Sequence, residues 1–229
     1  MKTNTLLTLF AAVLILFPLS STASEVATSG AEVGKWTMDY EAAAALAKEK
    51  KLPMLLNFTG SDWCGWCKLM DKAVYAEDDW KTYAADKLVL VTIDFPQDSS
   101  IVPKKFLKQN EELKSKFEVR GYPSYVILDS DGETKLGQLG AGQGKTPSSF
   151  IEEVEGVTRL SQSSIDAKVA ELGEPKGSEY LKAIKSVETE KSALDDWIAT
   201  GPAKNEENNK KFEAFNESIA AAQKKLAEY

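Results

Sequence analysis

The chain has 229 residues, with 28 basic and 35 acidic side chains and a formal net charge of −7. This acidic balance argues against nucleic acid as a partner, because nucleic-acid binding requires a basic surface. The chain contains no histidine, which excludes Ser-His-Asp and Cys-His catalysis and removes the commonest metal ligand.

The first 23 residues have the pattern of a secretory signal peptide. Lys2 supplies a positive start, a mainly apolar run of twelve residues extends from Leu6 to Phe17, and small residues precede a cleavage site after Ala23. As a helix, the run would cover only about 18 Å of a bilayer core roughly 30 Å thick. We therefore expect a protein that is periplasmic or otherwise exported, without stable membrane insertion of the mature chain. Residues 24–35 are expected to form a flexible N-terminal segment.

Residues 36–160 alternate between predicted helices and strands. Residues 39–50 are rich in strong helix formers, and the apolar run 53–58 that follows predicts a buried strand. Residues 87–95 are apolar on both faces, as is typical of a central strand in a covered sheet. The further predicted elements are a helix over 65–76, a loop over 96–103, a helix over 104–118, strands over 125–129 and 135–139 joined by a turn at Asp131-Gly132, and a helix over 147–160. This order indicates an α/β sandwich with a mixed sheet.

Residues 161–229 form a predicted helical C-terminal extension. Apolar residues recur at helical spacing from Ile184 to Ile198 and from Phe212 to Leu226, and a Thr-Gly-Pro stop at 200–202 separates the two stretches. The pattern predicts two amphipathic helices folded back as a hairpin. Each helix has about two heptads, fewer than a coiled coil needs, so we expect these stripes to pack on each other or on the α/β domain.

Both cysteines, Cys64 and Cys67, lie in the segment "GSDWCGWCKLM". As a structural disulfide, the pair would contribute only roughly 2 kcal/mol, because the loop that it closes is short. As a metal site, the pair supplies two of the four ligands that zinc needs, and the chain has no other Cys or His. Lys68 stands where covalent haem attachment needs histidine. We therefore expect no metal and no cofactor.

Redox chemistry explains the spacing of the two cysteines better. Residues three apart on a helix bring their Cβ atoms within about 5 to 6 Å, close enough for a disulfide to open and close. A helix that begins at Cys64 would place its thiol at the positive end of the helix dipole. There the thiol pKa falls from about 8.5 into the range ~3.5 to 7.5. Cys64 is then the nucleophile, and Cys67, one turn in and more buried, acts second.

Three motifs occur in a fixed order: "DWCGWCK" after an apolar strand, "RGYPS" before a later strand, and "DGE" followed by Gly140. Together they resemble the thioredoxin family over residues 36–160. The resemblance implies a thioredoxin-like sandwich and a cis peptide bond at Tyr122-Pro123, facing the cysteines. The wording "NFTGSDWCGWC" is closer to exported thioredoxin-like proteins and to the soluble domains of membrane thiol reductases than to cytosolic thioredoxin. By the same resemblance, a membrane thiol reductase is the expected electron donor.

Five residues around the cysteines are candidate contacts for a protein substrate: Trp63, Gly65, Trp66, Tyr122 and Pro123. The Trp66 ring offers a flat apolar contact, and Trp63 is expected to pack beside the pair. The substrate backbone would run extended beside Pro123 and pair as an added strand.

The chain departs from the family pattern at two places. The buried aspartate that the family carries on the strand before the motif has no clear match. Asn57 stands nearest, one residue further from Cys64 than expected, and asparagine cannot take a proton, so this acid is either missing or moved. Asp62 is a substitute candidate for proton transfer, with an exposed loop carboxylate as the alternative. The chain also has surplus residues at 96–112, which form either a partner-contacting loop and helix or a solvated charged helix.

These features predict a thiol-disulfide oxidoreductase that acts as a reductant on the disulfides of exported proteins. The alternative is a non-catalytic binding or scaffold protein that uses the α/β platform and the C-terminal helices. The motif alone does not decide between reductase, oxidase and isomerase, because 30 mV of potential corresponds to only about 1.4 kcal/mol.

Overall fold

The computed structural model describes residues 26–229, so the predicted signal peptide lies outside the described residues. A five-stranded sheet has the order β1-β3-β2-β4-β5. Its strands are β1 (Trp36–Thr37), β2 (Met54–Thr59), β3 (Val89–Asp94), β4 (Ser124–Leu128) and β5 (Lys135–Gly140). The first three are parallel to one another, and β4 and β5 run antiparallel to their neighbours. The predicted mixed sheet is confirmed.

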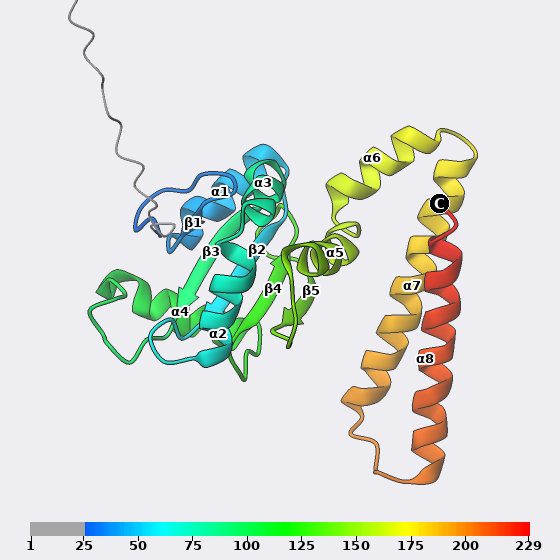
Figure 1. Cartoon of the computed structure of the whole chain (residues 1–229). Coiled ribbons are helices and arrows are strands. Elements are labelled where there is room, and N and C mark those ends of the chain that lie inside the picture. The colour runs from blue at the N-terminus through cyan, green and yellow to red at the C-terminus, as the bar shows by residue number, and fades with distance from the viewer. Residues whose placement is uncertain (1–25) are drawn as a thin grey trace, which may run out of the picture.

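Helices cover both faces of this sheet (Figure 1). Side chains of α1 (Tyr40–Lys50) and α4 (Lys104–Lys116) pack on one face. The other face is covered by α2 (Gly65–Met70), the π-helical segment η1 (Asp71–Tyr75), α3 (Asp78–Lys87) and α5 (Pro147–Thr158). The predicted thioredoxin-like sandwich is therefore present. The helix α3 was not predicted, because its sequence is mostly polar and it buries only Trp80 and Ala84.

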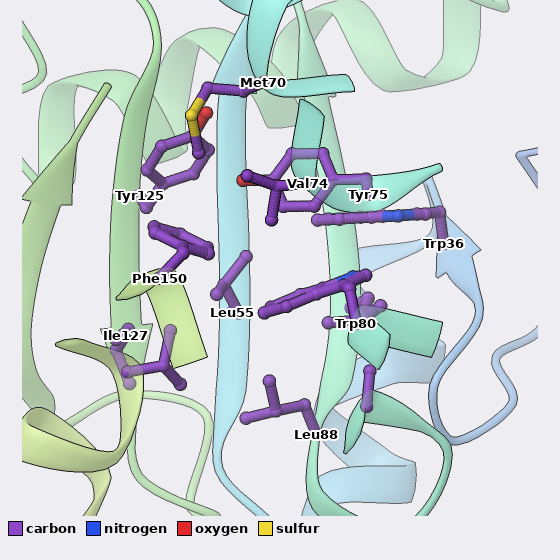
Figure 2. Close-up of a cluster of buried hydrophobic side chains, with 13 residues drawn as sticks. Trp36, Leu55, Met70, Val74, Tyr75, Trp80, Leu88, Tyr125, Ile127 and Phe150 are labelled. Atoms are coloured by element: carbon purple, nitrogen blue, oxygen red, sulfur yellow. The ribbon is translucent and has the colours of Figure 1, made fainter. Parts of the chain in front are cut away.

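The core on the α2 face is strongly aromatic (Figure 2). The Tyr75 ring lies 5.2 Å from Trp36, 5.2 Å from Trp80, 5.9 Å from Tyr125 and 5.9 Å from Phe150, measured between ring centroids. Aromatic pairs in such arrangements contribute about 0.5–1.5 kcal/mol each beyond the area that they bury. This aromatic cluster packs the segment from α2 to α3 against the sheet.

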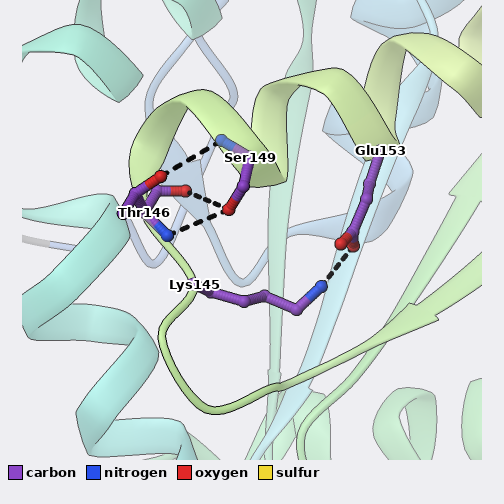
Figure 3. Close-up of polar contacts among 4 residues, drawn as sticks. All are labelled: Lys145, Thr146, Ser149 and Glu153. Atoms are coloured by element: carbon purple, nitrogen blue, oxygen red, sulfur yellow. Dashed lines mark hydrogen bonds and ion pairs between the residues drawn. The ribbon is translucent and has the colours of Figure 1, made fainter.

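Local contacts stabilise the N-terminus of α5, where the sequence predicted a helix to begin at Pro147 (Figure 3). Thr146 caps the helix: its hydroxyl accepts from the backbone N–H of Ser149, and the Ser149 hydroxyl accepts from the N–H of Thr146. Pro147 occupies the first turn, where its missing N–H costs nothing. Lys145 and Glu153 form an ion pair beside this turn. The helix therefore begins where local chemistry favours it.

The residues before β1 are hydrogen-bonded to it. The N–H of Ala27 donates to Trp36 O at 3.0 Å, and the N–H of Met38 donates to Ala27 O at 2.8 Å. The N–H of Gly30 donates to the Asp39 carboxylate at 3.1 Å. The described part of the predicted flexible segment therefore has defined contacts, while the domain boundaries themselves stay a prediction.

The C-terminal extension contains α6 (Gln162–Leu172), α7 (Lys176–Ala199) and α8 (Glu206–Leu226). The predicted hairpin is confirmed as α7 and α8, whereas α6 was not predicted. Figure 1 shows the hairpin to one side of the α/β domain, with α6 leading to it. Its apolar cluster includes Ile165 from α6, Tyr180 from α7 and Leu226 from α8. Between residues 26 and 229, no helix is both long enough and apolar enough to span a membrane.

Candidate redox site

Cys64 and Cys67 form a disulfide at the first turn of α2, with their Cα atoms 5.2 Å apart. Cys64 is the N-cap residue, and its Sγ accepts the N–H of Cys67 at 3.2 Å. The helix therefore begins at Cys64, where exposed N–H groups and the helix dipole favour a negative charge. Cys64 is 5% exposed and Cys67 2% exposed, so both are buried in the disulfide form and differ little in access.

The turn before Cys64 is held by its own backbone. β2 ends at Thr59, and the N–H of Cys64 donates to Gly60 O at 2.8 Å. A Cβ atom at Gly60 would lie 2.4 Å from Cε2 of Trp63, so only glycine lets the indole pack over the turn. Lys68 donates from Nζ to the carbonyl of Asp62 at 2.6 Å. These contacts fix the direction in which the strand enters the helix.

The Tyr122–Pro123 peptide bond is cis, as the family resemblance implies. β4 begins directly after it, and Ser124 pairs with Phe58 near the end of β2. Because β2 leads into the cysteine turn, this register places Pro123 beside the start of that turn. The Tyr122 ring lies 5.8 Å from the Trp63 ring, edge to face. Two of the predicted substrate contacts therefore touch each other next to the disulfide.

Large apolar side chains are exposed around the cysteines. Trp63 is 43% exposed, Trp66 50% and Leu69 43%. Trp63 is anchored through Nε1, which donates to Phe95 O at 2.8 Å, while Gly65 has open space where a side chain would be. Leu69, which the sequence analysis did not single out, follows Trp66 by three positions on α2. Its spacing of three positions from Trp66 indicates that the two side chains share one face of α2, and this spacing could have identified Leu69 from the sequence.

The surplus segment and the end of α4, which continues beyond it, contact residues around the cysteine turn. Asp62 accepts the backbone N–H groups of Gln97 at 3.0 Å and Asp98 at 2.8 Å. From α4, Asn110 donates through its side-chain amide to Asp94 O at 3.0 Å, and Lys114 places Nζ 4.9 Å from the Phe95 ring centroid. The loop and helix after β3 are therefore part of the structure around the redox pair.

Three acidic or amide side chains near the pair have different environments. Asn57 is buried, and its Oδ1 has no hydrogen-bond partner among the described residues. Hydrogen bonds from the backbone of Asp98 and Gln97 lower the pKa of Asp62. Partial burial and the carboxylate of Asp94 raise the pKa of Asp71 to about 6.

Asp71 is the residue that the sequence analysis missed. It lies four positions after Cys67, and its N–H donates to Cys67 O, so the two share one helix face. The spacing "CKLMD" carries this signal. The described residues contain no group of three or more Asp, Glu, Cys or His side chains arranged to hold a metal ion.

Comparison with known proteins gives the family. Over 121 residues the chain is 32% identical to "Disulfide bond reductase DsbH" of Chlamydia pneumoniae, spanning 53% of this chain and 71% of that protein. The family model described as thioredoxin-like matches residues 35–130. The chain belongs to the thioredoxin-like family. Its cysteine pair at the start of a helix in this fold makes it a thiol-disulfide oxidoreductase.

Two further relatives agree with this assignment. The thioredoxin-like chain is similar to a solved structure titled "DsbH Oxidoreductase", with 30% identity and a TM-score of 0.51 over 57% of this chain and 88% of that one. It is also 30% identical to "Thioredoxin-related protein DsbJ" of Chlamydia pneumoniae over 50% of this chain, although it spans only 32% of that protein.

Proposed function

We propose that this oxidoreductase reduces disulfides in exported proteins. One observation carries the proposal: Cys64 caps α2, with the N–H of Cys67 donating to its Sγ. The same donor and the helix dipole would stabilise a Cys64 thiolate after reduction. The direction is supported by the relative named as a disulfide bond reductase, of which this chain spans 71%. Export is supported by the signal-peptide pattern of residues 1–23.

The reaction has two exchange steps. The Cys64 thiolate attacks one sulfur of the substrate disulfide, the substrate S–S bond breaks, and a mixed disulfide forms while the released substrate sulfur takes up a proton. The thiolate of Cys67 then attacks Cys64, and the second substrate sulfur leaves as a thiolate. The products are a reduced substrate and the intramolecular Cys64–Cys67 disulfide. An external donor of two electrons restores the dithiol, and we propose a membrane thiol reductase for this role.

The Cys67 thiol must lose its proton before it attacks, and the chain has no histidine to accept that proton. We assign it to Asp71 rather than to Asp62 or Asn57. Asp71 lies one turn from Cys67 on the same face, and its pKa of about 6 leaves it ionised at neutral pH yet able to hold a proton. Asp62 is bound to backbone N–H groups that lower its pKa. Asn57 does not titrate in this range.

Substrate binding uses the surface around the disulfide. The exposed rings of Trp63 and Trp66 supply apolar contact area, and Tyr122 supports Trp63 from the side. The backbone before β4, at Pro123, would pair with an extended substrate segment. Gly65 lets that segment approach the sulfur of Cys64 without a side chain in its path.

Turbidity during insulin reduction, with dithiothreitol as electron source, tests this function. The wild-type protein should accelerate insulin precipitation over dithiothreitol alone, and Cys64→Ser should remove the acceleration. Equal activity of the two proteins would refute the proposal. The potential of the Cys64/Cys67 couple in a glutathione buffer tests the direction: a value near about −270 mV indicates a reductant, and one near about −120 mV an oxidant.

A binding or scaffold role is the second candidate. The hairpin exposes Leu181, Ile198 and Phe212, at 44%, 48% and 43%, and these side chains favour a protein contact. Deleting 161–229 should abolish partner capture in this case while leaving insulin reduction intact. A variant in which both cysteines are replaced, and which keeps full cellular function, would favour the scaffold role.

A further inference from the structure

A cleft of about 510 Å³ opens beside the redox helix, between η1 and the edge strand β1. Its volume lies in the range of small-molecule sites, about 300–1,000 Å³. One part of its wall is apolar and includes Trp36, Met38 and Ile101; the other is polar. Trp36 and Tyr75 in this wall form an edge-to-face pair with ring centroids 5.2 Å apart. Figure 2 shows the two rings as neighbours.

The floor of the polar part is a patch of four side chains on two neighbouring strands. Thr59 of β2 pairs with Asp94 of β3, and Asn57 pairs with Thr92. Residues two apart on a strand share a face, so all four point into the cleft that they line. In an α/β fold this face of the sheet is normally apolar. Leu55 and Leu90, two positions before Asn57 and Thr92 on the same face, belong to the core.

Two acceptors in this patch are unsatisfied. Asn57 is 5% exposed and Thr59 3% exposed, and neither Asn57 Oδ1 nor Thr59 Oγ1 has a hydrogen-bond partner in the described part of the chain. Buried polar atoms are nearly always paired. Asn57 Oδ1 can accept, and the Thr59 hydroxyl can accept or donate, so both atoms leave room for a hydrogen-bond partner from outside the described residues.

The charge in the wall has the sign that favours a cation. Asp71 and Asp94 both line the cleft. Partial burial raises the pKa of Asp71, and repulsion from the Asp94 carboxylate raises it further. Within the described part of the chain, the donors to the Asp94 carboxylate are neutral: the N–H and the hydroxyl of Ser61. Lys81, at the rim, directs its Nζ to Asp78 at 3.2 Å. Among residues 26–229, no lysine or arginine pairs with the carboxylate of Asp71 or Asp94.

We propose that this cleft binds a small organic ammonium ion with an apolar body. The N–H donors of the ion would satisfy Asn57 and Thr59 and pair with the Asp71 carboxylate, while its body would pack against the Trp36 and Tyr75 rings. The π-helical turn of η1 brings Asp71 and Tyr75 into one wall, and such turns are frequent at functional sites. A bare metal ion fits less well, since the cleft offers two carboxylates and far more room than one ion needs.

Titration of phenethylamine into the full mature chain, followed by amide NMR at pH 7.5, tests the site, with phenylacetate as the matched anionic probe. We expect saturable shifts at Asn57, Thr59 and Asp71 with phenethylamine and none with phenylacetate. Asp71→Asn should weaken binding about tenfold, as expected for one lost charge-assisted hydrogen bond. Thr59→Val, which keeps the side-chain shape, should also weaken it. Asp131→Asn, in the β4–β5 turn and outside the cleft, should not.

Binding should also weaken between pH 7.5 and pH 5. Asp71 takes up a proton in this interval and then no longer attracts a cation. The titratable groups that face it are Asp94 from β3, Tyr75 on η1, Tyr125 from β4 and Lys81 at the rim; the tyrosine pKa values are raised, so these hydroxyls stay neutral. Shifts that do not saturate, that map away from the cleft, or that are equal in wild type and Asp71→Asn would overturn the proposal. The readout is binding, so its outcome is independent of the redox activity.

Discussion

The carboxylate of Asp62, two residues before Cys64, accepts the backbone N–H of Gln97 at 3.0 Å, across 35 positions of the chain. This bond joins the cysteine turn to the loop that follows β3. Asp62 therefore has a structural role in the site. Its hydrogen bonds hold the surplus segment in one conformation beside the disulfide.

Replacing Asp62 by alanine should loosen this loop. Backbone N–H groups at Gln97 and Asp98 would lose their acceptor, so their hydrogen exchange should become faster. Because the pKa of Asp62 is lowered in the folded state, its contribution is present above the ordinary carboxyl pKa and is lost as pH falls through the lowered value. Protection factors at residues 97 and 98, which correct for the slower intrinsic exchange at acid pH, should therefore also fall in the wild type below about pH 4.

The matched control for this prediction is Asp131→Ala. Asp131 likewise accepts backbone N–H groups, from Glu133 and Thr134 at 2.8 Å each, but it lies in the β4–β5 turn. This variant should leave exchange at Gln97 and Asp98 unchanged. Unchanged exchange in Asp62→Ala as well would mean that other contacts hold the loop.

Replacing Asp71 by asparagine should stabilise the protein at neutral pH. The folded state raises the pKa of Asp71 from its ordinary value of 3.8 to about 6, so ionisation of this group costs stability as pH rises through that window. Asp71 keeps contact with solvent, and with screening taken into account we expect a gain of only about 1 kcal/mol.

Urea unfolding at pH 7.5 and pH 4 measures this effect. The gain should be present at pH 7.5 and should vanish near pH 4, where Asp71 is protonated in the folded wild type. Asp78→Asn, which changes an exposed carboxylate paired with Lys81, should change stability little at either pH. A loss of stability at pH 7.5 in Asp71→Asn would contradict the assigned environment.

Replacing Gly60 by alanine should displace Trp63. The new Cβ would lie 2.4 Å from the indole, and overpacking of this kind costs typically 1–3 kcal/mol. Gly65→Ala is the matched control, because no atom lies within 4 Å of its Cβ position, and it should change stability by no more than about 0.5 kcal/mol. Thermal unfolding measures the midpoint temperatures of both variants. Equal midpoints would show that Trp63 moves aside without cost.

Much of the fold follows from the sequence because its signals are local. The apolar runs of β2 and β3, the Pro-start of α5 and the Gly-Pro stop before α8 each act within a few residues. The pattern at α3 is weaker: Trp80 and Ala84 are buried by aromatic neighbours from distant segments, which a polar stretch of sequence does not reveal. The helix α6 was missed for a similar reason, since Ile165 is its only buried side chain within the helix.

The site divides in the same way. Cys64, Cys67 and the cis bond at Pro123 belong to short motifs, so they could be predicted. The spacing from Cys67 places Asp71 on the redox helix, but its raised pKa comes from burial in the folded protein and then from Asp94 on β3, and neither can be read from the sequence. The attachment of residues 97 and 98 to Asp62 likewise depends on folding, which brings separate loops together.

Trapping of the mixed disulfide tests the central claim, that Cys64 is the attacking thiolate because α2 begins there. Reduced Cys67→Ser and Cys64→Ser proteins would be incubated with oxidised insulin, quenched in acid and mapped by mass spectrometry. We predict a covalent adduct on Cys64 in the Cys67→Ser protein and little adduct in the Cys64→Ser protein. An adduct that forms faster on Cys67, with Cys64 unreactive, would contradict the account.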